Sequence, residues 1–299
     1  MGFGLGAVAE KHYFCSAPTK GEKKMSKEVS PIGVFDSGYG GLTILKDIRA
    51  ALPEYDFLYL GDNARAPYGP RSFEVVYEFT LQAVRYLFSK GCKLVILACN
   101  TASAKALRSI QQNDLPLIDP TRRVLGVIRP TVERLAALTA TGSIGVLGTA
   151  GTIQSGSYDI EIAKMHPTFR TFGHACPLWA ALVEARETSC PGTEYFVQKD
   201  LEALLAMNAD IDTIILACTH YPLLSQLMEK HLPSHISLVN QGPIVAESLA
   251  DYLRRHPEME TRLSKNASCS FLTTENAAKF GDLASVFLGA PVQATHVTL

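Results

Sequence analysis

Two apolar runs of this chain end in the same three residues, Leu-Ala-Cys. One lies within residues 93–104 and the other within residues 212–223. A continuous apolar run of about four to eight residues is typical of a strand buried on both faces of a parallel sheet. Small hydroxyl and amide residues follow each run, which predicts that the strand turns into a helix. Each half of the chain is therefore expected to present one thiol, Cys99 or Cys218, at a strand tip, where open α/β sheets bind ligands.

Strand-like and helix-like patterns alternate through the rest of the chain. Further strands are predicted at residues 31–35, 57–60, 115–118, 168–174, 236–239 and 270–273. Helices are predicted at residues 41–51, 72–91, 102–112, 158–165, 178–186, 194–208, 244–255 and 277–288. This alternation predicts an α/β fold with mostly parallel sheets flanked by helices.

The order of elements also repeats along the chain. The segment that opens at Gly145 echoes the segment that opens at Gly33, and each leads to its cysteine strand after a similar interval. Similar order, similar spacing and a shared cysteine predict a two-fold duplication. We therefore expect two similar domains with an active site in the cleft between them.

Length and composition are those of a globular protein. The chain has 299 residues, of which 47% are hydrophobic and 19% are charged, enough for two domains and a sizeable core. The net charge of −1 favours neither nucleic acid nor an anionic membrane as a partner. No apolar run reaches the length that spans a bilayer. Residues 1–30 lack periodicity and are expected to form a flexible extension rather than a signal peptide.

The seven cysteines do not resemble a disulfide framework. Their number is odd and their spacing irregular, so free thiols in a reducing cytoplasm are expected. No CxxC or HExxH pattern occurs, so no metal site is predicted. The cysteines interpreted as small buried hydrophobic residues are Cys15, Cys92, Cys176, Cys190 and Cys269.

Two thiols that face one ligand from opposite sides suit proton transfer at a carbon atom. One thiolate removes a proton from one face, and the other thiol delivers a proton to the opposite face. A free thiol has a pKa of about 8.5, so the site must stabilise the thiolate. A helix N-terminus after each cysteine, His220 beside Cys218 and Asp36 near Cys99 are expected to assist.

Two opposed bases are not a complete site for removing an α-proton. General acid–base catalysis contributes about 10²–10⁴ in rate, so fixed donors must also stabilise the developing carbanion. Besides backbone N–H groups, the candidate donors are Ser37, Asn100, Thr101, Thr149 and Thr219. No phosphate-binding loop is present, so pyridoxal phosphate is not expected and no cofactor is predicted.

Five segments together resemble one family. They are GVFDSGYGGL from Gly33, GDNARAPYG from Gly61, ACNTASA from Ala98, CPLWAALVE from Cys176 and ACTHYPLL from Ala217. The chain resembles the aspartate/glutamate racemase family, and within it the bacterial glutamate racemases. The resemblance implies an enzyme that interconverts L- and D-glutamate without a cofactor and supplies D-glutamate for peptidoglycan in the bacterial cytoplasm. It also implies a homodimer.

The resemblance assigns roles to residues by motif. It makes Cys99 and Cys218 the two bases, and Asp36, Glu184 and His220 the auxiliary acid–base groups. The substrate contacts that it implies are Asp36, Ser37, Tyr68, Gly69, Asn100, Thr101, Thr219 and His220. The family fold further implies that residues 31–123 and 236–299 form the first domain and that residues 124–235 form the second.

Other functions remain open at this point. An aspartate racemase of the same family would use the same two thiols, and sequence spacing does not measure the depth of a pocket. A non-catalytic amino-acid-binding protein would bind its ligand without exchanging the α-hydrogen. A thiol-redox protein would readily join Cys99 to Cys218, which opposed thiols on either side of a ligand should not do.

Overall fold

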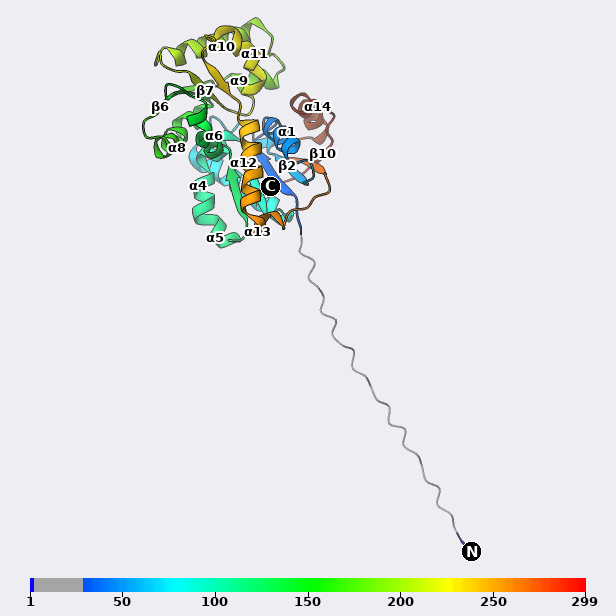
Figure 1. Ribbon diagram of the computed structural model, residues 1–299. Helices are drawn as coiled ribbons and strands as arrows, with labels where there is room; N and C mark the ends of the chain where they lie inside the picture. The colour runs from blue at the N-terminus through cyan, green and yellow to red at the C-terminus, as the bar shows by residue number, and fades with distance from the viewer. Residues whose placement is uncertain (3–28) are drawn as a thin grey trace.

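The computed structural model describes residues 1–2 and 29–299 and contains two parallel sheets (Figure 1). Cys15 and nearly all of the expected extension, residues 1–30, lie outside the described residues. The six-stranded sheet has the order β10 (Ala294–His296), β9 (Cys269–Thr273), β2 (Phe57–Gly61), β1 (Ile32–Asp36), β3 (Leu94–Leu97) and β4 (Arg123–Gly126). The four-stranded sheet has the order β6 (Arg170–Ala175), β5 (Ser143–Gly148), β7 (Thr213–Ala217) and β8 (Ser237–Val239).

The two sheets repeat one arrangement. The order β2-β1-β3-β4 in the first sheet matches β6-β5-β7-β8 in the second, and all these pairs are parallel. Gly33 aligns with Val95 on the neighbouring cysteine strand, and Gly145 aligns with Ile214 in the same way. The predicted α/β fold with two similar halves is confirmed.

Helices connect the strands and cover the sheets. In the first half they are α1 (Gly41–Ala51), α2 (Phe73–Ser89), α3 (Asn100–Lys105), α4 (Leu107–Ser109), α5 (Leu115–Ile118) and α6 (Ile128–Arg134). The second half contains α7 (Ala150–Gln154), α8 (Ser157–Met165), α9 (Trp179–Glu184), α10 (Pro191–Leu205) and α11 (Ser225–His231). The chain then forms α12 (Gln241–Arg255), α13 (Pro257–Glu260) and α14 (Ala277–Leu288). Short 3₁₀ turns are η1 (Asn63–Arg65), η3 (Leu135–Ala137) and η4 (Tyr221–Leu224).

The strand predicted at residues 115–118 is wrong, because this segment is helical. It forms α5, which continues from α4 through the π-helical turn Ile110–Asp114. An apolar run of four residues fits either a strand or a buried helical turn, and periodicity cannot separate them at that length. Pro116 is the second residue of α5 and has no backbone N–H to donate to the helical turn before it.

The sheets divide the chain close to, but not at, the expected domain boundaries. Strand β4 extends the first sheet to Gly126, beyond the expected end at residue 123. Strand β8 pairs with β7 in the second sheet, whereas the family resemblance places residues 236–299 in the first domain. We define the first lobe by β1–β4, β9 and β10, and the second lobe by β5–β8. Helix α12 packs on α1 of the first lobe and also on α6 and β7, so it joins the two (Figure 1).

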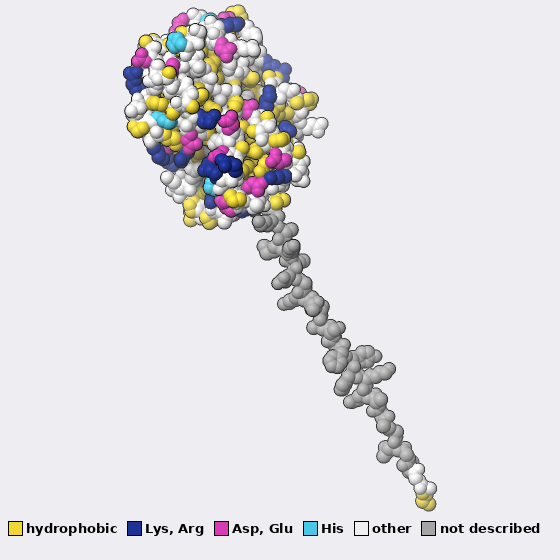
Figure 2. All heavy atoms as spheres, viewed as in Figure 1, with side chains coloured by type: hydrophobic (Ala, Val, Ile, Leu, Met, Phe, Trp, Pro, Cys, Tyr) yellow, Lys and Arg dark blue, Asp and Glu magenta, His cyan; other side chains and the backbone are white. Residues whose placement is uncertain are grey.

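The buried strands form the core, and the surface carries mixed charge. All residues of β1, β3 and β7 are buried, as continuous apolar runs predict. On the visible face, Lys and Arg side chains are interspersed with Asp and Glu (Figure 2), in keeping with the net charge of −1. In the described part of the chain, none of the helices has both the length and the apolar character needed to cross a bilayer.

Candidate active site

Cys99 lies between β3 and α3, as the first apolar run predicts. It is the N-cap residue of α3, and its Sγ accepts a hydrogen bond from the Ala102 N–H at 3.5 Å. The Ser37 hydroxyl, which follows β1, lies 3.4 Å from the same sulfur. Cys99 is only 6% exposed. The carboxyl ends of β1 and β3 therefore bring a serine hydroxyl and a thiol together.

Asp36 is the last residue of β1 and is buried. Its Oδ1 accepts a hydrogen bond from the Gly38 N–H at 2.8 Å, whereas its Oδ2 has no hydrogen-bond partner among the described residues. Burial raises the pKa of Asp36, and the charge of His220 partly opposes this effect. A buried carboxylate oxygen without a partner is costly, and such groups are typical of functional sites.

The second thiol belongs to a chain of three polar groups. His220 Nδ1 lies 3.8 Å from Cys218 Sγ, and His220 Nε2 lies 2.8 Å from Glu184 Oε1 of α9. Burial opposes protonation of His220, but its contacts with Cys218 and Glu184 outweigh burial and raise its pKa to about 10. The contacts of the imidazole with Cys218 and Glu184 therefore favour its protonated form.

The expected stabilisation of a thiolate is not found at Cys99, whose surroundings favour the neutral thiol. Burial and the nearby Asp36 carboxylate raise the pKa of Cys99 to about 12, and the hydrogen bond from Ser37 only partly opposes them. Helix α3 has only six residues, so its dipole is weak. After Cys218 the chain forms the 3₁₀ turn η4, whose N-cap is His220, instead of a helix that begins at the cysteine.

The Asp36 and Cys218 motifs meet where the start of α1 packs against the second lobe. The Thr43 hydroxyl donates a hydrogen bond to the Thr219 carbonyl at 3.0 Å. Gly40 leaves no space for a side chain, because a Cβ atom there would lie 2.1 Å from Thr219 Oγ1 and 2.5 Å from His220 Nδ1. The Asp36 and Cys218 motifs are thus neighbours across the lobe boundary.

A second set of contacts joins the lobes beside Cys99. The Gly151 N–H donates to the Gly69 carbonyl at 2.8 Å. The hydroxyls of Thr101 and Thr149 lie 2.9 Å apart. Gly69 and Thr101, two of the expected substrate contacts, therefore touch the turn after β5. This turn of the second lobe corresponds to the turn after β1 in the first lobe.

Two of the expected substrate contacts already use their polar groups within the protein. The Tyr68 hydroxyl donates to Asp62, and both residues are buried. The Asn100 amide donates to Gln241 Oε1 at 2.7 Å and accepts from the Tyr158 hydroxyl at 2.7 Å. These hydrogen bonds fix the orientation of Tyr68 and Asn100 beside Cys99.

Sequence reasoning missed the buried network around Asn100. Gln241, at the start of α12, also donates to the Tyr158 hydroxyl at 2.7 Å and to the Thr131 hydroxyl at 2.9 Å. Thr131 belongs to α6 and Tyr158 to α8, so the network connects four helices that are far apart in sequence. Gln241 and Tyr158 lie in helices without a distinctive motif, and only the fold reveals that they are buried together.

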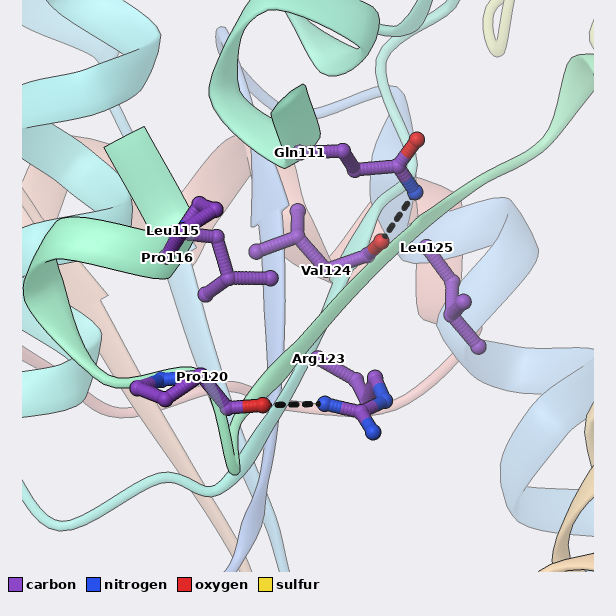
Figure 3. A pocket seen from close by; sticks show the side chains of 7 residues that line it. All are labelled: Gln111, Leu115, Pro116, Pro120, Arg123, Val124 and Leu125. Atoms are coloured by element: carbon purple, nitrogen blue, oxygen red, sulfur yellow. Dashed lines mark hydrogen bonds between the residues drawn. The ribbon is translucent and has the colours of Figure 1, made fainter. Parts of the chain in front are cut away.

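One cavity lies away from these residues. It has a volume of about 310 Å³ and is lined by α5, the π-helical turn and β4 (Figure 3). Its lining residues are Gln111, Leu115, Pro116, Pro120, Arg123, Val124 and Leu125. None of them is a predicted site residue, so this cavity does not mark the candidate active site.

Comparisons with known proteins agree on one kind of enzyme. The family model described as Asp/Glu/Hydantoin racemase matches residues 39–249. A curated glutamate racemase of Streptococcus suis is 36% identical over 90% of this chain and 98% of its own. One of Levilactobacillus brevis is 38% identical over 90% of this chain and 95% of its own.

Solved structures give the same result. A glutamate racemase isoform from Bacillus anthracis matches with a TM-score of 0.82 at 35% identity, covering 91% of this chain and 98% of that one. The glutamate racemase of Francisella tularensis, solved in complex with D-glutamate, matches with a TM-score of 0.80 at 31% identity, with the same coverage.

Proposed function

Because the chain belongs to the Asp/Glu/Hydantoin racemase family, we propose that Cys99 and Cys218 are the two bases with which it racemises glutamate. The protein is an isomerase that interconverts L- and D-glutamate. The observation that supports these roles most directly is the pairing of each thiol with its own polar partners. Cys99 lies beside Ser37 and interacts with the charge of Asp36, and Cys218 lies beside His220.

The proposed reaction moves one proton at each face of the α-carbon. One thiolate removes the α-proton, and the opposite thiol donates its proton to the other face. In the reverse direction the two groups exchange roles. Asp36 assists proton movement at Cys99, and His220, held by Glu184, assists it at Cys218.

Because the pKa of Cys99 is high, we propose that the bound substrate helps to form the Cys99 thiolate. Burial and the charge of Asp36 favour the protonated thiol of Cys99. The α-ammonium group of glutamate brings a positive charge, and a cation near a buried thiol favours its thiolate. We therefore propose that substrate binding itself activates Cys99.

Polar groups around the thiols form the proposed substrate site. They are Asp36, Ser37, Tyr68, Gly69, Asn100, Thr101, Thr219 and His220. Fixed donors of this kind stabilise a developing carbanion best when closure excludes water. The contacts between the lobes at Gly40 and Gly151 bring these groups to one boundary. No cofactor or metal takes part in the proposed reaction.

Exchange of the α-hydrogen in deuterated water tests the two-base mechanism. With one base on each face, the product enantiomer should contain deuterium before the remaining substrate loses its own hydrogen. Mass spectrometry after separation of the enantiomers measures both. Equal early labelling of substrate and product would indicate a single shared base and contradict the proposal.

Removal of either thiol should have a large effect. Cys99→Ala and Cys218→Ala should each lower kcat/KM by at least about 10²-fold, because general acid–base catalysis typically contributes about 10²–10⁴. Circular dichroism, started from each glutamate enantiomer, measures the rate. Cys190→Ala is the matched control, since Cys190 lies at the start of α10 outside the proposed site. Full activity in either active-site variant would exclude the assigned bases.

The remaining biological roles are proposals that follow from the family. We propose that the enzyme is a homodimer in the cytoplasm and that its D-glutamate is used for peptidoglycan. Analytical ultracentrifugation should show a particle of twice the 32.5 kDa chain mass.

An aspartate racemase is not favoured, because the curated relatives described above are glutamate racemases. With L-aspartate, the circular dichroism signal should not change at a rate comparable to that seen with L-glutamate.

A further inference from the structure

Three side chains with different ligand chemistry meet at the carboxyl end of β6. His174 lies on this strand, Cys176 follows it, and Asp200 projects from α10. One ligand atom of each lies within 4.8 Å of the other two, and His174 Nε2 is 3.0 Å from Asp200 Oδ1. Within residues 1–2 and 29–299, no other set of three His, Cys, Asp or Glu side chains meets this condition.

We propose that His174, Cys176 and Asp200 bind one divalent transition-metal ion of the zinc class, with water as the fourth ligand. Zinc binds imidazole nitrogen, thiolate sulfur and carboxylate oxygen, usually in tetrahedral geometry. Such an ion holds these atoms about 3.3–3.6 Å apart, so modest side-chain rotations complete the site. A thiolate and a carboxylate together carry the two negative charges that neutralise a divalent cation.

The burial of the three residues suits this role. Cys176 is only 1% exposed, and its sulfur contacts the His174 carbonyl weakly, at 4.0 Å, and also interacts with the Asp200 carboxylate. The His174 and Asp200 side chains are 21% and 15% exposed, so the ligand set opens to solvent on one side. An ion and its water ligand can enter from that side, while the thiolate lies in the protein interior.

The site is linked to the His220–Glu184 pair without belonging to it. The Tyr221 hydroxyl donates to the Cys176 carbonyl at 2.8 Å, and Tyr221 directly follows His220. Cys176 also begins the segment that leads into α9, which ends at Glu184. A bound ion would therefore fix the start of the segment that leads to Glu184 against α10, next to Tyr221. Its expected role is structural, and it takes no part in proton transfer.

Cobalt binding tests the proposal directly. The starting protein is the full chain with Cys99→Ser and Cys218→Ser, because those thiols could bind a soft metal themselves. Titration of the metal-free protein with Co²⁺ should produce thiolate-to-cobalt charge-transfer absorption that saturates at one equivalent. His174→Gln, Cys176→Ala and Asp200→Asn should each weaken this binding by at least roughly 10–100-fold, the loss seen even for groups that only support metal ligands.

A matched control and a second measurement decide the result. Cys190→Ala, in the same lobe, should leave the cobalt spectrum unchanged. Zn²⁺ should raise the melting temperature of the starting protein but not that of Asp200→Asn, because binding to the folded state alone stabilises it. Asp200→Asn decides the test if Cys176→Ala does not fold. Absence of the charge-transfer band, or cobalt affinity in Asp200→Asn equal to that of the starting protein, overturns the site. The outcome is independent of racemase activity.

Discussion

At the scale of the residue, His220 shows how neighbours control protonation. Burial alone would make this imidazole neutral, yet Cys218 and Glu184 raise its pKa to about 10. The pKa of an unfolded histidine is about 6.5. Because the folded value is higher, protonation of His220 stabilises the fold fully below about pH 6.5, and this contribution is lost as the pH rises through about 10.

The melting temperature should reveal this contribution. Between about pH 7 and pH 10, the melting temperature of the parent should fall more steeply than that of His220→Gln, because the variant has no proton to lose at this position. Differential scanning calorimetry at a series of pH values provides the measurement. His231→Gln, which removes a histidine paired with Glu194 elsewhere in the second lobe, is the control. Equal slopes in the parent and His220→Gln would contradict the assignment.

At the scale of the element, the start of α1 packs closely against the segment that follows Cys218. A methyl group at Gly40 would overlap Thr219 and His220, so Gly40→Ala must displace one of them. A displacement of about 1 Å near reacting groups can cost about 10²-fold in rate. We expect Gly40→Ala to lower kcat/KM by that order. Gly192→Ala, whose new methyl group would have only an ordinary contact, should be fully active.

The first turn of α12 should be important for stability. Gln241→Leu would leave the Asn100 amide N–H without its acceptor and would remove one hydrogen bond each from Tyr158 and Thr131. A buried polar group left without a hydrogen bond costs about 1–3 kcal/mol, so we expect a loss of at least about 2 kcal/mol in unfolding free energy. Urea denaturation measures the loss. The surface variant Gln198→Leu on α10 should change stability by less than about 0.5 kcal/mol. A similar change in both variants would show that the network contributes little.

Prediction from sequence succeeded where the signal is local. The apolar runs before Cys99 and Cys218 identified β3 and β7, because continuous burial leaves a pattern within a few residues. The network of Gln241 and Tyr158 could not be foreseen, because it depends on which helices pack together. The same reason hid the proximity of His174 to Asp200, which lie on a strand and a helix separated by α9.

At the scale of the whole molecule, contacts between the lobes should control glutamate binding. A Cβ atom at Gly151 would lie 2.5 Å from the Gly69 carbonyl oxygen, which is part of the backbone and cannot rotate away. We expect Gly151→Ala to separate the lobes beside Cys99 and to reduce the thermal stabilisation produced by glutamate. Thermal scans with and without ligand measure this difference. An unchanged ligand-induced shift would mean that the contact is not needed for binding.

The return of the chain to the first sheet has a mechanical consequence. The backbone passes from one lobe to the other between β4 and β5, and it passes back between β8 and β9. Two covalent crossings define an axis, and we expect bending about it to strain the backbone less than other relative motions of the lobes. Twisting around the line between the lobe centres would stretch both crossings at once. We therefore expect any opening that admits glutamate to follow this axis, so that both thiols return to the same positions when it closes.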